Sequence, residues 1–93
     1  MKTPIHPGEV LKDEIEACGI NAATVAKEIK VPGNRLSQIM QGKRGTTAET
    51  ALKLGKFFGN SAHFWMKLQY MYELDSITEE HRKEIESIIP LNK

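Results

Sequence analysis

A polar segment between residues 31 and 45 carries the side chains best suited to bind another molecule. Its sequence, VPGNRLSQIMQGKRG, combines amide and hydroxyl groups with three basic side chains, Arg35, Lys43 and Arg44. Side-chain amides can form paired hydrogen bonds with adenine, and arginine can do the same with guanine. Lysine and arginine also neutralise phosphate groups. The segment therefore has the chemistry to contact both the base edges and the backbone of a nucleic acid.

The sequence carries no comparable signal for catalysis or metal binding. His6 lies near Glu9, but no Ser or Cys nucleophile stands in a catalytic motif, and a histidine before a helix-opening proline is typical of a capping or packing residue. The three histidines, His6, His63 and His81, are far apart, and the lone Cys18 has no second cysteine at zinc spacing. We expect no enzyme, no metal and no cofactor.

Length and hydropathy indicate one small domain. The 93 residues fit a single core, so we expect one domain over residues 1–93. No apolar run approaches the roughly 18 residues that a membrane span needs. The first ten residues lack the apolar core of a signal peptide. We therefore expect a cytoplasmic protein without a membrane partner.

The net charge of +1 hides two oppositely charged regions. From Lys27 to Lys56 seven cations accompany two anions, which leaves a charge of +5. From Glu73 to Glu86 two cations accompany six anions, which leaves −4. The basic region suits a polyanion, whereas the acidic region suits a cationic partner or a solvated helix.

Helix-start and helix-stop residues divide the chain into helices. Expected starts are Pro7, Asn21, about Gly33, Thr46 or Thr47, Ser61 and Thr78, and expected stops are Gly19, Val31–Pro32, Gly42, Gly59 and Pro90. Apolar residues recur between them at helical spacing and should face a core, among them Leu11, Ile15, Cys18, Val25, Ile29, Leu36, Ile39, Ala51, Leu52, Leu54 and Phe58. No strand-like alternation is sustained, so we expect an all-α fold.

The helices expected within residues 21–42 have the dimensions of a helix-turn-helix. Each is about ten residues long, and the break between them is short. If Leu36, Ile39 and Met40 face the core, the outward residues of the second of these helices are Asn34, Arg35, Ser37, Gln38 and Gln41. This set is polar and nearly uncharged, which favours reading of base edges over a solvated face with Glu and Lys pairs.

Two apolar groups in the C-terminal half can serve either a core or a dimer interface. The first includes Phe58, Phe64, Trp65 and Leu68, whose helical spacing favours packing over stacking on single-stranded nucleic acid. The second is the isoleucine stripe of the last helix, expected over about residues 78–89: Ile77, Ile85, Ile88 and Ile89. For this stripe, core and dimer interface remain equal alternatives.

Several motifs in order make the comparison with known families specific. They are HPGEVLKDEI from His6, VPGNRLSQIMQGKRG from Val31, and TAETALKLGKFFGNSAHFWMKLQYMYEL from Thr47. Over about residues 5–75 the chain resembles the HigA-type antitoxins, a VapI-like branch of the lambda-repressor-like (XRE) helix-turn-helix superfamily. The resemblance implies five helices around one core, to which this chain adds a C-terminal helix. It also implies a homodimer, a palindromic operator and a HigB-type toxin that cleaves messenger RNA.

The resemblance also implies roles for individual residues. We expect base contacts from Asn34, Arg35 and Gln38, and backbone contacts from Asn21, Ser37, Gln41, Lys43 and Arg44. The chain departs from the family in having Pro32 where many relatives carry a capping Ser or Thr, and Ala22 where many carry Gln. Gly33, at a recognition position, has no side chain with which to read a base.

Two functions fit these features. The first is an antitoxin that represses its own operon as a dimer and neutralises a HigB-type toxin. The alternative is a stand-alone helix-turn-helix transcriptional regulator without a toxin partner. A pure protein-interaction module that uses the acidic regions is a weaker third reading.

Overall fold

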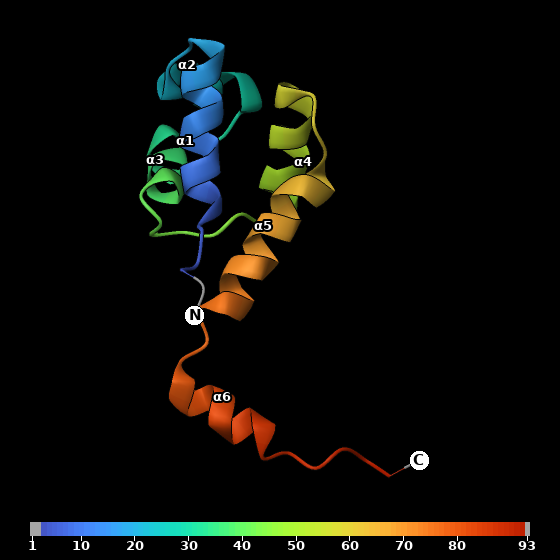
Figure 1. Cartoon of the computed structure of the whole chain (residues 1–93). Coiled ribbons are helices and arrows are strands. Elements are labelled where there is room, and N and C mark those ends of the chain that lie inside the picture. The colour runs from blue at the N-terminus through green and yellow to red at the C-terminus, as the bar shows by residue number, and fades with distance from the viewer. Residues whose placement is uncertain (1–2, 93) are drawn as a thin grey trace.

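A computed structural model describes residues 3–92, and within them it contains six helices and no strand. The helices are α1 (Pro7–Cys18), α2 (Ala22–Ile29), α3 (Gly33–Met40), α4 (Ala48–Phe58), α5 (Ala62–Asp75) and α6 (Glu79–Glu86). Helices α1, α2 and α3 lie together, α4 and α5 lie beside them, and α6 projects away from the other five (Figure 1). The expected all-α fold, with five helices around one core and an added C-terminal helix, is confirmed.

The core lies among the first five helices. Trp65 of α5 is completely buried, and the other buried apolar residues come from α1 to α4: Leu11, Ile15, Val25, Ala26, Ile29, Val31, Leu36, Ile39, Ala51 and Leu54. The indole nitrogen of Trp65 donates a 2.8 Å hydrogen bond to the side-chain oxygen of Asn60, in the turn between α4 and α5. Its ring packs edge-to-face against Phe64, with centroids 5.2 Å apart. The expected packing role of this aromatic group is therefore confirmed for Trp65, whereas Phe64 stays partly exposed.

Most helix starts follow from local capping. The side chains of Asn21, Ser61 and Thr78 each accept a hydrogen bond from the backbone N–H three residues later, as expected. For α4 the structure selects Thr47, whose hydroxyl oxygen accepts from the Thr50 N–H. Thr46, the other expected cap, is buried instead.

Three positions differ from the sequence expectation. Leu52 is 63% exposed, because it lies about 100° around α4 from the inward-facing Ala51. Cys18 is exposed in the last turn of α1, and Ile20, beyond the left-handed Gly19, packs on the core instead. The last helix ends at Glu86, before the expected Ile89, and the Ile88 N–H then donates to the Ile85 carbonyl in a turn.

The N-terminal turn of α1 lies directly against the C-terminal turn of α3. A Cβ atom at Gly8 would stand 2.0 Å from the carbonyl oxygen of Ile39, so no side chain fits there. This approach joins backbone to backbone and leaves neither helix free to shift. The orientation of α3 is therefore set by the start of α1.

His6 completes this junction. Its Nδ1 accepts a 2.9 Å hydrogen bond from the Gly8 N–H, and a Glu9 carboxylate oxygen accepts one of 3.2 Å from the His6 N–H, which together form a capping box. The imidazole is buried and packs edge-to-face on Tyr72 of α5, with ring centroids 4.7 Å apart. Burial lowers the pKa of His6 below 6.5, and the Glu9 carboxylate opposes that shift. The capping role expected for His6 is confirmed.

Replacement of Gly8 by alanine tests the contact between α1 and α3. We expect Gly8→Ala to lower the free energy of unfolding by about 3 kcal/mol, because the added methyl group overlaps a backbone oxygen that cannot move alone. Gly33→Ala is the matched control, since its Cβ would meet nothing within 4 Å. Urea unfolding followed by circular dichroism measures both. Equal stability of the two variants would contradict a close contact at Gly8.

The pH dependence of stability tests the buried cap. Because the pKa of His6 is lower in the folded chain, the unfolded chain binds its proton first as pH falls below 6.5. The contribution of the neutral imidazole is complete above pH 6.5 and is lost on acidification. We therefore expect wild type to lose more stability between pH 7.5 and pH 5 than His6→Asn, whose amide caps without titrating. Parallel pH profiles from urea unfolding would contradict this.

Candidate nucleic-acid interface

Helix α3 separates an apolar face from a polar face. Leu36 and Ile39 are buried and Met40 is half-buried. On the other side Asn34, Arg35, Ser37 and Gln41 are exposed, whereas Gln38 is half-buried. The five residues expected on the outward face thus lie together there. This face has about two turns of polar side chains available to a ligand.

Two hydrogen bonds order this outer face. The Gln41 amide nitrogen donates to the Ser37 hydroxyl at 2.9 Å, and Nε of Arg44 donates to the Gln38 amide oxygen at 3.0 Å. The second bond uses the oxygen of the Gln38 amide and not its NH2 group. Side chains held in this way lose less conformational entropy when a partner binds. The face is therefore partly organised before any ligand arrives.

The turn after α3 directs two basic residues to the same end of the helix. Gly42 has a φ of 77°, and its N–H donates to the Ile39 carbonyl. The Lys43 N–H donates to the Gln38 carbonyl at 2.9 Å, which completes a Schellman motif. The sequence pattern QGKRG therefore ends the helix sharply and leaves Lys43 and Arg44 exposed beside its outer face.

The turn between α2 and α3 is fixed from α4. Lys30 adopts a left-handed conformation with a φ of 59°, the single non-glycine residue with positive φ among residues 3–92. The ammonium group of Lys53 donates to the Lys30 carbonyl at 3.1 Å and lies 3.4 Å from the Glu49 carboxylate. Pro32 then starts α3 without a side-chain cap, in agreement with the departure seen in the sequence. These contacts set the angle between the two helices.

Asn21 lies at the start of α2, apart from the α3 face in sequence. It is exposed, and its side-chain oxygen accepts a 2.8 Å hydrogen bond from the Thr24 N–H. The following residue, Ala22, is half-buried against the core. Asn21 therefore acts as a helix cap in the structure, and the role expected for it toward a phosphate stays a prediction.

Sequence reasoning missed Gln69, which holds the segment after α3 in place. This buried residue of α5 accepts a 2.7 Å hydrogen bond from the Thr46 N–H and donates one of 2.9 Å to the Glu73 carboxylate. A Cβ at Gly45 would lie 2.9 Å from its amide nitrogen, so this glycine lets the segment pass close to α5. A glutamine on the apolar side of α5, four residues before a glutamate, was the available signal.

Other kinds of site lack support in the described part of the chain. Within residues 3–92 no group of three or more His, Cys, Asp or Glu side chains could hold a metal ion. None of the helices described there has the length and apolar character to cross a membrane.

Comparison with known proteins agrees with this architecture. The helix-turn-helix family matches residues 11–65. Virulence-associated protein I of Dichelobacter nodosus is 39% identical over 95% of this chain and 82% of its own length. A HigA-family addiction module antidote protein from Coxiella burnetii has a TM-score of 0.89 and 39% identity, over 97% of this chain and all of that chain.

A second solved structure includes DNA. The Pseudomonas aeruginosa antitoxin HigA with the higBA promoter has a TM-score of 0.87 and 39% identity, over 97% of this chain and 100% of that chain. Fold, sequence and helix-turn-helix match thus agree over nearly the whole length. The chain belongs to the helix-turn-helix family and, within it, to the HigA-type antitoxins.

Proposed function

We propose that this protein binds operator DNA as a homodimer, represses its own operon and neutralises a HigB-type toxin. The observation that carries the DNA-binding part is the polar outer face of α3, which is held rigidly and ends in two exposed cations. Operator binding would take place where the chromosome lies, so the proposed location is the cytoplasm. This role requires no catalytic group or cofactor.

On this proposal α3 enters the major groove. Asn34, Arg35 and Gln38 contact base edges, because their amide and guanidinium groups can form paired hydrogen bonds there. Positioning contacts to the DNA backbone come from Asn21, Ser37, Gln41, Lys43 and Arg44. The hydrogen bond between Arg44 and Gln38 links a backbone-contacting group to a base-reading group. The solved Pseudomonas antitoxin with its promoter supports the same use of the fold.

Two copies are needed for useful specificity. A single recognition helix covers only a few base pairs, and helix-turn-helix proteins normally bind two half-sites about one helical turn apart. The basic middle of the chain also contributes sequence-independent attraction to the phosphates. Dimerisation is therefore part of the proposed function.

The toxin part rests on charge. HigB-type toxins are expected to be basic ribonucleases, and this chain has two acidic surfaces to offer them. The first lies on α1 and includes the exposed Asp13 and Glu16, and the second lies on α6 and includes the exposed Glu80 and Glu84. Complementary charges favour fast and selective association. Co-purification of the chain with the product of the neighbouring gene tests whether such a partner exists. Operator binding without any co-purifying toxin would indicate the stand-alone regulator.

Removal of one amide tests base reading. We expect Gln38→Ala to weaken operator binding by about 1–3 kcal/mol and to relax preference at one base pair, because it removes an edge contact but no core atom. Lys43→Ala is the control, and should weaken binding evenly across sequences and lower the salt slope by about one. Titration of operator and scrambled DNA by fluorescence anisotropy separates the two effects. Unchanged base preference in Gln38→Ala would exclude groove reading by this residue.

Charge reversal on each acidic surface tests toxin contact. If α1 binds the toxin, Asp13→Lys/Glu16→Lys should weaken toxin binding at least tenfold, which is about 1.4 kcal/mol. The pair Glu80→Lys/Glu84→Lys tests α6 in the same way, and each pair is the control for the other. Calorimetric titration with purified toxin gives the affinities, and operator preference should persist in both variants. Full toxin affinity in both double variants would rule out both surfaces.

A further inference from the structure

The C-terminal part of the chain has no partner within its own fold. We define the arm as residues 77–92, which comprise α6 and its flanking segments. None of the residues of α6 is buried, and the arm extends away from the core helices, as Figure 1 shows. The arm accounts for much of the elongated shape, whose principal extents are 51, 26 and 21 Å. Such a helix gains almost nothing from packing in a single copy of the chain.

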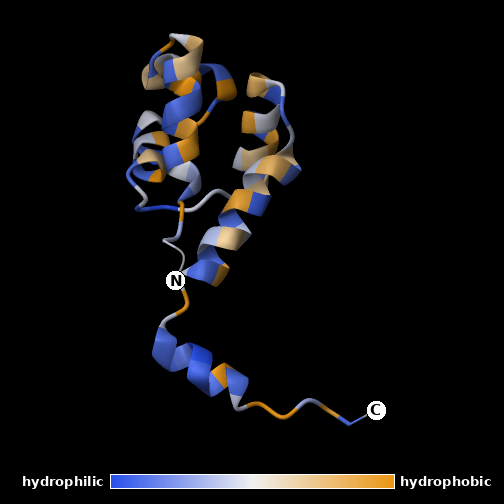
Figure 2. Ribbon diagram, viewed as in Figure 1, coloured by the Kyte–Doolittle hydropathy of each residue, from blue (hydrophilic) through white to orange (hydrophobic). Residues whose placement is uncertain are grey.

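The arm nevertheless carries an apolar stripe. Five of its side chains are between 38% and 88% exposed: Ile77, Ile85, Ile88, Ile89 and Leu91. Figure 2 shows hydrophobic colour on one part of the otherwise hydrophilic α6 and along the segment after it. Isolated exposed apolar residues are ordinary, but a stripe of this length marks an interaction site.

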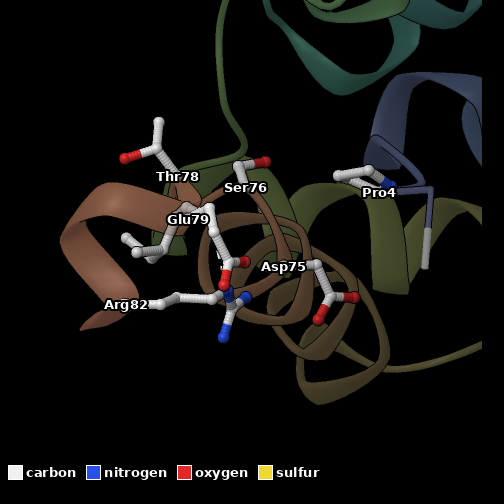
Figure 3. A pocket seen from close by; sticks show the side chains of 7 residues that line it. Pro4, Asp75, Ser76, Thr78, Glu79 and Arg82 are labelled. Atoms are coloured by element: carbon white, nitrogen blue, oxygen red, sulfur yellow. Dashed lines mark hydrogen bonds between the residues drawn. The ribbon is translucent and has the colours of Figure 1, made fainter. Parts of the chain in front are cut away.

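The junction between α5 and α6 holds the arm in its extended direction. From α6, the Arg82 guanidinium donates to the carbonyl of Leu74 at 2.7 Å and to that of Ile77 at 3.3 Å. The Ser76 hydroxyl donates to the Tyr72 carbonyl at 2.7 Å. Figure 3 shows the hollow at this junction, whose volume is about 640 Å³ and whose lining includes Asp75, Glu79 and Arg82. Polar bridges to the end of α5 thus favour an arm that points away from its own core.

The solved relatives support this placement. The Coxiella and Pseudomonas chains superpose on this one over 97% of its length, at TM-scores of 0.89 and 0.87. A superposition of that extent includes most of the arm. An arm folded back on α5 in those chains would not align so completely.

A matching apolar groove lies between the N-terminal segment and α5. It has a volume of about 390 Å³ and is lined by Thr3, Ile5, Val10, Leu68, Met71, Tyr72 and Asp75. Ile5 is 59% exposed and Met71 is 39% exposed, so apolar surface remains open to solvent at this groove. We call it the N-terminal groove. Its floor includes Tyr72, the residue on which His6 packs.

We propose that the arm of each chain occupies the N-terminal groove of a second copy, so that two chains exchange arms around a two-fold axis. This inference rests on the homodimer of the proposed function and specifies its interface. A second copy fits because stripe and groove occur on the same chain, so one reciprocal contact closes the pair. The exposed apolar residues of stripe and groove amount to on the order of 800 Å² per chain, close to what each partner contributes to a standard interface.

Mass measurements on the full chain without DNA test the exchange. We expect light scattering to give wild type twice the chain mass of 10.5 kDa at micromolar concentration. Ile85→Asp/Ile89→Asp should dissociate at least 100-fold more readily yet keep its helical circular dichroism, because α6 contributes nothing to the core. Leu52→Asp is the matched control, since Leu52 is as exposed but lies on α4, and it should remain dimeric.

Cross-linking identifies the surfaces that meet. On a Cys18→Ser background, mixed Met71→Cys and Ile89→Cys chains, one with a mass tag, should form a disulfide-linked heterodimer on mild oxidation. A mixture of Leu52→Cys and Ile89→Cys chains is the control and should not. A monomeric wild type, or a dimer that survives Ile85→Asp/Ile89→Asp, would overturn arm exchange. An arm-exchanged dimer that fails to prefer operator DNA would instead contradict the proposed function alone.

Discussion

The structure depends on one close backbone contact, between Gly8 at the start of α1 and the Ile39 carbonyl at the end of α3. This contact leaves no room for a side chain, so it fixes the distance between the two helices. His6 caps α1 at the same point, and Gly42 turns the chain below its ring. The polar face of α3 is thus oriented by atoms on its opposite side. A recognition surface made of flexible side chains thereby rests on a rigid base.

A second set of contacts uses buried polar groups to place the segment that follows α3. Gln69 accepts from the Thr46 N–H, and Lys53 donates to the Lys30 carbonyl at the other end of the helix-turn-helix. Both bonds join residues that are 23 positions apart in sequence. They satisfy backbone groups that would otherwise lack partners in loops. The DNA-facing part of the molecule is consequently held at both ends by α4 and α5.

Features with local causes could be predicted from the sequence. Asn21, Ser61 and Thr78 cap their helices through residues three positions away, and the apolar spacing of Leu36 and Ile39 separates the two faces of α3. Features with distant causes could not. Thr47 rather than Thr46 caps α4, in a segment where the Thr46 N–H is bonded to Gln69, and no pattern near Thr46 reports a partner in α5. The sequence also left the isoleucine stripe undecided between core and interface, because nothing within one chain covers it.

The solvent-exposed state of α6 has a consequence for how such proteins diversify. Since α6 shares no buried residue with the first five helices, substitutions in it leave the packing of those helices undisturbed. Duplicated copies of the gene can therefore diverge in this region while they keep the same folding core. Paralogues within one cell would then sort into separate, non-mixing pools by their C-terminal sequences, independently of what their third helices recognise.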